Sequence, residues 1–182
     1  MRKKNDDNDT VDEKIFEVKS MPISRECLGL AGEFAVASEL CRRNIYAQLT
    51  FGNKKRTDIL IMSENENFMR IEVKAKQKAK WPNCKGIYGN NVFLVFVDFA
   101  KKKGEERPDF YIMNSEDWRH FVENEIEKIK QKKPGENIEM NSENVPVWRN
   151  QINKYKKPYM GIGVNPKSIQ EHREDWDKIK AE

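Results

Sequence analysis

The sequence contains few of the residues that build disulfide frameworks or zinc sites. Its 182 residues include three cysteines and two histidines. Cys27 and Cys41 fall on one predicted helix and cannot pair with each other, and no two cysteines have Cys-x-x-Cys spacing. His120 and His172 are too widely separated to indicate a zinc site. We therefore expect reduced thiols and a cytoplasmic protein.

Long apolar segments and several catalytic motifs are also missing. No run of 18 apolar residues occurs, so the sequence predicts no contact with a membrane. Residues 1–20 are too polar for a signal peptide, and we expect them to form a mobile, charged N-terminal arm. The chain lacks a Gly-x-Ser-x-Gly motif, a phosphate-binding Gly-rich Lys-Ser/Thr loop and a paired-histidine metalloprotease helix. These absences argue against the enzyme classes that depend on such motifs.

Two apolar segments that carry charged residues are the most informative part of the chain. The segments 57–62 and 68–74 are rich in β-branched residues, and the polar stretch 63–67 between them predicts a hairpin. Side chains alternate along a strand, so Glu72 and Lys74 point to one face of the second strand. Charges on a partly buried sheet face are costly unless something compensates them. A hard cation such as Mg2+, which prefers oxygen ligands, would do so.

The set Asp58, Glu72 and Lys74 resembles the motif of the PD-(D/E)XK nuclease superfamily. Members carry an acidic residue on one strand of a hairpin and an acid-x-lysine on the next, and a preceding helix often adds a glutamate. Glu33, on a predicted helix, matches that position. Thr57 stands where the name-giving proline would be, a departure that many members share. The resemblance covers roughly residues 24 to 115.

The resemblance implies a Mg2+-dependent nuclease, with Mn2+ as a substitute, that hydrolyses phosphodiester bonds. We expect Asp58, Glu72 and the Val73 carbonyl to hold the metal. Lys74 would orient the attacking water or stabilise developing negative charge. Glu33 would bind the metal through water or help to form a second metal site. DNA is the expected substrate, with an endonuclease of the restriction or repair and recombination type as the expected enzyme and a homodimer as a possible assembly.

Other interpretations of the same residues remain open. The charged residues can form a salt-bridged face of a partly exposed hairpin. The chain can also be a non-catalytic nucleic-acid-binding module, or a protein-interaction subunit of a defence or mobile-element system that retains the nuclease fold.

Basic residues follow the motif, although the net charge is only +4. They are candidates for binding a phosphate backbone, or else a solvated surface. The candidates are Lys76, Lys78, Lys80 and Lys85. Trp81 among them can stack on a base or cover the edge of the core. Gln77 can contact a phosphate or the attacking water, or remain an exposed loop amide. The segment 154–157, around Tyr155, either extends the basic surface or forms a solvated turn.

The remaining pattern predicts an α/β protein. The resemblance makes this a restriction-endonuclease-like α/β/α sandwich with a central mixed β-sheet. Predicted helices cover 24–44 and 115–132, predicted strands cover 45–51, 91–99, 109–113 and 159–164, and a last helix begins at Asn165. We expect a nuclease-like core over 21–133 and a C-terminal extension over 134–182 that packs on it, with 136–147 as a loop or short extended segment.

Overall fold

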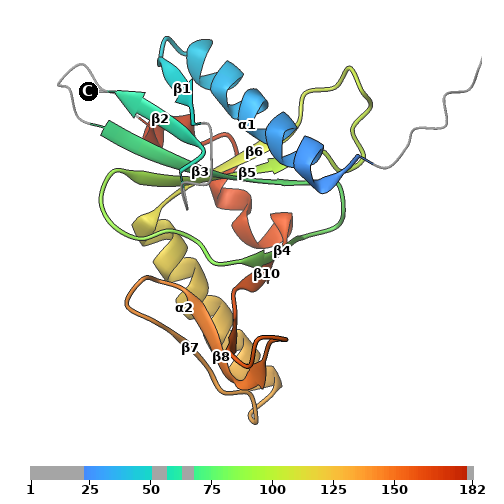
Figure 1. Ribbon diagram of the computed structural model, residues 1–182, viewed down its shortest axis with the longest axis vertical. Helices are drawn as coiled ribbons and strands as arrows, with labels where there is room; N and C mark the ends of the chain where they lie inside the picture. The colour runs from blue at the N-terminus through green and yellow to red at the C-terminus, as the bar shows by residue number, and fades with distance from the viewer. Residues whose placement is uncertain (1–22, 51–56, 63–67, 180–182) are drawn as a thin grey trace, which may run out of the picture.

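A five-stranded mixed sheet forms the centre of a mixed α/β fold (Figure 1). The computed structural model describes residues 23–50, 57–62 and 68–179, so the predicted N-terminal arm and the turns at 52–56 and 63–67 lie outside the described residues. The strand order is β1-β2-β3-β5-β6, in which β3 and β5 are parallel and the other neighbours antiparallel. The strands are β1 (Ala47–Leu49), β2 (Ile59–Met62), β3 (Phe68–Lys76), β5 (Val92–Asp98) and β6 (Asp109–Asn114).

The predicted pairing of the two motif strands is confirmed. Strands β2 and β3 are antiparallel, and Ile59 lies opposite Ile71. Asp58 stands one residue before β2, outside the paired residues, and its backbone N–H donates to the Ile71 carbonyl at 2.9 Å. This hydrogen bond ties Asp58 to β3 directly beside the segment that carries Glu72 and Lys74.

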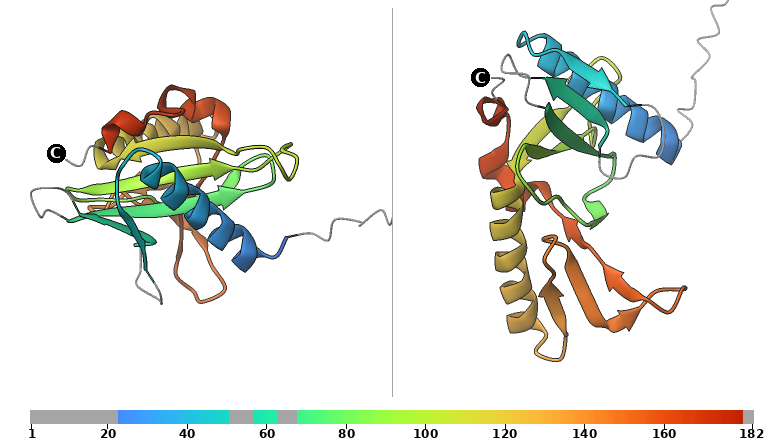
Figure 2. Two further views of the ribbon diagram at one scale, coloured as in Figure 1. Left: turned by 90° about the horizontal axis from the view of Figure 1, so that it is seen from above. Right: turned by 60° about the vertical axis from the view of Figure 1, so that its left-hand side comes forward.

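Each face of the sheet is covered by its own apolar cluster, because the buried strands alternate their side chains between two sides. Val95 and Val97 belong to the cluster that also contains Val36 and Leu40 of helix α1 (Arg25–Cys41). The other cluster contains Leu94 and Phe96, with residues of helix α2 (Ser115–Lys132), β4 (Trp81–Cys84) and β10 (Ile162–Val164). Figure 2 shows α1 and α2 on opposite sides of the sheet.

Side-chain caps fix the start of both α-helices. The Ser24 hydroxyl accepts a hydrogen bond from the Cys27 N–H at 3.1 Å. Asn114 caps α2 and forms a capping box with Asp117. Helix α2 ends at Lys132, directly before Pro134 and Gly135.

A second, three-stranded antiparallel sheet follows α2, and of the loop or short extended segment predicted over 136–147 the structure has the extended form, as the short strand β7 (Ile138–Met140). The sheet has the strand order β7-β8-β9, in which the other strands are β8 (Pro146–Ile152) and β9 (Pro158–Met160). Ile138 is fully buried in the α2 cluster, so a tertiary contact that local sequence does not reveal forms this strand.

Three regions differ from the predicted elements. Residues 77–91, which lie outside every predicted strand, contain β4, which pairs with β10. The expected strand 159–164 is divided into β9 and β10 because Gly161, at φ +101°, interrupts the extended backbone. The expected last helix is a pair of short 3-10 segments, η1 (Pro166–His172) and η2 (Trp176–Lys178), and Ile169 at φ −132° breaks the first of them.

No helix among the described residues has the length and apolarity needed to cross a membrane.

Candidate active site

The three motif residues meet where β2 begins. The Glu72 and Lys74 side chains form an ion pair, with Oε1 and Nζ 2.6 Å apart. The Asp58 carboxylate accepts a hydrogen bond from the Val73 N–H at 2.6 Å. The contact fixes Asp58 against the strand that carries the other two residues, so the acids and the lysine form one group.

The second oxygen of Glu72 is the unusual feature of this group. Glu72 is 6 % exposed, yet its Oε2 atom has no hydrogen-bond partner among the described residues. An unpaired buried carboxylate oxygen is costly, and such an atom in a folded protein calls for a specific explanation. A bound cation would provide the missing partner.

The Val73 peptide also faces this group. Because its N–H donates to Asp58, and the N–H and C=O of one strand residue point to the same side, the Val73 carbonyl is directed toward β2 as well. Strand β2 begins only at Ile59, so Val73 lies beyond its paired residues. A carbonyl in this position suits the predicted role of a metal ligand.

Glu33 approaches the group from α1. Burial raises the pKa of Glu33, the negative charge of Asp58 raises it further, and Lys74 opposes both effects. Glu33 is thus within electrostatic reach of two of the motif residues. Its neighbour Gly32 lies against β3, where an added Cβ would be 2.7 Å from the Ala75 Cβ, and this close packing brings α1 to the site.

The donor set fits a hard divalent cation with few protein ligands. Within the described parts of the chain, no group of three or more histidine, cysteine or carboxylate side chains could enclose a metal. Mg2+ does not require such a cage, because it keeps several waters and takes one or two carboxylates. Asp58, Glu72 and the Val73 carbonyl are oxygen donors of that kind.

Two of the predicted nucleic-acid contacts are wrong. Lys76 is 4 % exposed. Its Nζ atom lies 2.5 Å from the Asp98 Oδ1 atom and 4.6 Å from the centre of the Trp81 ring. Trp81 is 1 % exposed, and its indole N–H donates to the Val97 carbonyl at 3.2 Å. Both side chains are part of the core, where neither a phosphate nor a base can reach them.

The other candidates are accessible. Gln77 is exposed and stands just past the end of β3, outside the carboxylate group. Lys78, Lys80 and Lys85 are exposed in and around β4. The structure therefore retains these three lysines as possible phosphate contacts.

Two features near the site were missed by the sequence interpretation. Asp98 holds Lys76 away from solvent, and only the parallel pairing of β3 with β5 reveals that contact. Cys84 of β4 is buried beside the site, where burial raises its thiol pKa to about 12, with further influence from Lys74 and Glu72.

No protein-family model, curated protein or solved structure matches this chain.

Proposed function

We propose that the protein is a Mg2+-dependent nuclease, a DNA endonuclease of the PD-(D/E)XK type with a restriction-endonuclease-like core. The observation that carries the proposal is the buried, unpartnered Glu72 Oε2 beside Asp58 and Lys74. A merely structural salt bridge between Glu72 and Lys74 would not leave one buried oxygen without a partner. The central mixed sheet, with an acid-bearing hairpin and a glutamate on the preceding helix, agrees with the proposal.

Each residue has a role that follows from its position. Asp58, Glu72 and the Val73 carbonyl would hold the cation, which when bound positions the scissile phosphate and lowers the pKa of a coordinated water. Lys74, now paired with Glu72, would turn its ammonium to the attacking water or to the negative charge that develops on phosphate oxygens. Glu33 would hold a water by a hydrogen bond when its carboxyl group is ionised.

Cleavage assays with site variants test the proposal. Supercoiled, linear, single-stranded and branched DNA, and RNA, are incubated with the purified protein and Mg2+ or Mn2+. We expect cleavage of at least one DNA form, and a loss of at least about 100-fold in rate for Asp58→Asn, Glu72→Gln and Lys74→Ala. The matched control is Lys128→Ala on α2, which removes an exposed lysine from outside the site and should cleave like the parent protein.

Circular dichroism separates lost chemistry from lost folding, and Lys74→Gln is the alternative if Lys74→Ala does not fold. Cleavage by the Lys74 variants at the parental rate would contradict the proposal. A folded parent protein that cleaves no nucleic acid with either metal would also contradict it and would favour a binding module.

A further inference from the structure

The hairpin formed by β8 and β9 extends away from the central sheet, as the right-hand view of Figure 2 shows. Its tip, residues 153–157, is internally fixed. The Asn153 side-chain oxygen accepts hydrogen bonds from the N–H groups of Tyr155 and Lys157, at 2.8 and 3.2 Å. The Asn153 N–H donates to the Lys157 carbonyl at 2.8 Å. The tip is therefore a defined turn that presents its side chains in a fixed arrangement.

These side chains are basic and one is aromatic. Lys154, Lys156 and Lys157 are exposed, and Tyr155 is 70 % exposed with the Lys154 ammonium 4.9 Å from its ring centre. Between Glu143 and Glu171 the sequence contains no acidic residue. In the described part of the chain, no carboxylate lies within ion-pair distance of the three tip lysines. Their charge is available to a ligand.

The hairpin leads back to the candidate active site through paired backbone. After β9 the chain continues into β10, which pairs with β4. A Cβ added at Gly163 of β10 would lie 3.4 Å from the Lys80 ammonium, so the two strands bring Lys80 next to the base of the hairpin. The segment from Lys74 to Lys80 is the end of β3 and the short link to β4. The exposed lysines Lys78, Lys80 and Lys85 flank β4, between the catalytic group and the base of the hairpin.

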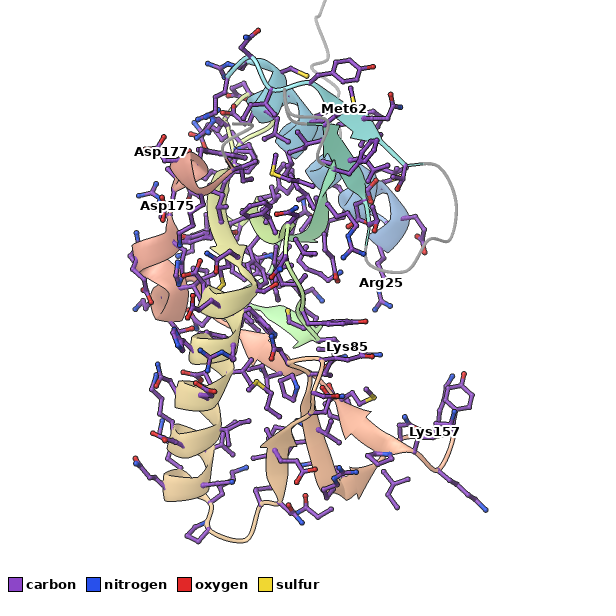
Figure 3. All side chains as sticks on the ribbon, turned by 90° about the vertical axis from the view of Figure 1, so that its left-hand side faces the viewer. Arg25, Met62, Lys85, Lys157, Asp175 and Asp177 are labelled. Carbon is purple, nitrogen blue, oxygen red and sulfur yellow. The ribbon has the colours of Figure 1, made fainter. Side chains whose placement is uncertain are left out.

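Figure 3 shows Arg25, Lys85 and Lys157 on the same side of the molecule, and Asp175 and Asp177 on the opposite side, where Asp175 pairs with Lys178. A polyanion that reaches the catalytic group from the side of Lys85 would also meet the tip of the hairpin.

Chain length limits how far the tip can be from the catalytic lysine. Seven residues separate Lys156 from Gly163, Gly163 contacts Lys80, and six residues separate Lys80 from Lys74. At about 3.5 Å per extended residue, the distance from Lys156 to Lys74 is therefore at most about 50 Å. One strand of duplex DNA advances about 3.4 Å per base pair, so this span corresponds to no more than about 15 base pairs.

We propose that the tip lysines Lys154, Lys156 and Lys157, with Lys80 and Lys85, bind the phosphate backbone of duplex DNA on one side of the scissile bond. The hairpin acts as an arm that holds the duplex within about 15 base pairs of the cut. The choice of duplex DNA as the ligand rests on the proposed nuclease function. The binding experiment that tests the arm does not require the protein to cleave DNA.

Binding without cleavage tests the arm. Affinity for a duplex of about 40 base pairs and for one of about 8 is measured by fluorescence anisotropy in chelator over a range of salt concentrations. The variant combines Lys154→Gln, Lys156→Asn and Lys157→Gln, in which asparagine suits the positive φ of residue 156. Each phosphate contact contributes about 0.9 to the slope of log affinity against log salt, so we expect the slope for the long duplex to fall by about 2 to 3.

The length dependence and a charge-matched control complete the test. The expected loss is at least tenfold in affinity for the long duplex at about 0.1 M salt, and smaller for the short duplex, whose few phosphates allow fewer simultaneous contacts with the site and the tip. The control combines Lys128→Gln, Lys130→Gln and Lys132→Gln on α2, which removes the same charge from a helix that also carries glutamates. It should keep the parental slope to within about one unit.

The results for the arm and for the nuclease are separable. A tip variant that keeps the parental slope, or that loses affinity equally for both duplexes, overturns the arm whether or not the protein cleaves DNA. A protein that cleaves nothing, but whose DNA binding depends on the tip lysines, overturns the nuclease and leaves the arm standing.

Discussion

Among single residues, Glu72 has the environment that a bound cation would change most. One of its oxygens pairs with Lys74, while the other is buried without a partner in the described structure. Buried carboxylates are usually satisfied on both oxygens. The unpaired oxygen destabilises the metal-free protein, so metal binding should raise the free energy of unfolding.

Metal binding should raise the melting temperature in the absence of DNA. At a Mn2+ concentration ten times its Kd, we expect stabilisation of about 1.4 kcal/mol, or a rise of about 3 to 5 °C for a protein of this size. Glu72→Gln and Asp58→Asn should abolish the rise, because each removes a negatively charged ligand. Glu139→Gln, which removes an exposed carboxylate on β7, should retain it. An undiminished rise in the Glu72 variant would place the metal elsewhere.

The comparison of Lys74 with Lys76 shows what the sequence can predict at this scale. Both side chains lie on the same face of β3, and the alternation of the strand predicts that correctly. Their environments differ because Asp98 reaches Lys76 from β5, whereas Lys74 is 36 % exposed. The partner comes from a strand more than twenty residues later in the chain, so local pattern cannot distinguish a buried lysine from a half-exposed one.

Among the elements, α1 and β3 are in unusually close contact, and this contact brings Glu33 to the site. Gly32 is buried against Ala75, and a side chain there would force the helix and strand apart. Gly29, one turn earlier in the same helix, has no atom within 4 Å of an added Cβ. The two glycines therefore form a natural pair for comparison.

Gly32→Ala and Gly29→Ala should have opposite effects. We expect Gly32→Ala to lower the free energy of unfolding by about 1 to 3 kcal/mol through overpacking, and to reduce cleavage because Glu33 moves with the helix. Gly29→Ala should raise the free energy of unfolding by about 0.5 to 1 kcal/mol, because alanine is the better helix former. Chemical denaturation and cleavage rates measure both effects. Equal responses from the two variants would show that the close contact does not position Glu33.

The elements that sequence reasoning found are those with strong local patterns. Helices α1 and α2 carry caps and helical periodicity, and the segments of β2 and β3 stand on either side of a polar stretch of sequence. The missed strands depend on distant partners instead. Strand β4 has only four residues and includes a proline, and it is a strand because β10, nearly eighty residues later, pairs with it.

For the molecule as a whole, an ion-pair network joins the beginning of the fold to its end. Glu39 of α1, whose side chain is 7 % exposed, pairs with Arg43 and Arg107, and Arg107 also pairs with Glu174 near the C-terminus. The hydrogen bond from Arg107 is the main cause that lowers the pKa of Glu39 to about 2, against an ordinary value of 4.5. The network thus links three segments that are distant in the sequence.

This network should make stability depend on acid pH. Because the folded pKa of Glu39 lies below its ordinary value, its contribution is complete above about pH 4.5 and is lost as the pH falls toward 2. We expect Glu39→Gln to cost about 2 kcal/mol at pH 7, less than the pKa difference alone implies, because Arg107 is 42 % exposed and screened by solvent. The cost should shrink toward pH 2. Glu174→Gln should show a weaker effect of the same sign, and a Glu39 variant as stable as the parent at pH 7 would contradict the role of the network.

The closed tip at 153–157 also has a consequence for how such a protein can change over generations. Because Asn153 completes the turn with backbone groups, the side chains at 154–157 take no part in the core and can be exchanged without disturbing its packing. The Glu72 group, in contrast, is embedded in the central sheet and tolerates little. Mutation can therefore change the surface of the hairpin tip while the Glu72 group stays constant, which makes the tip a suitable place to insert a foreign peptide.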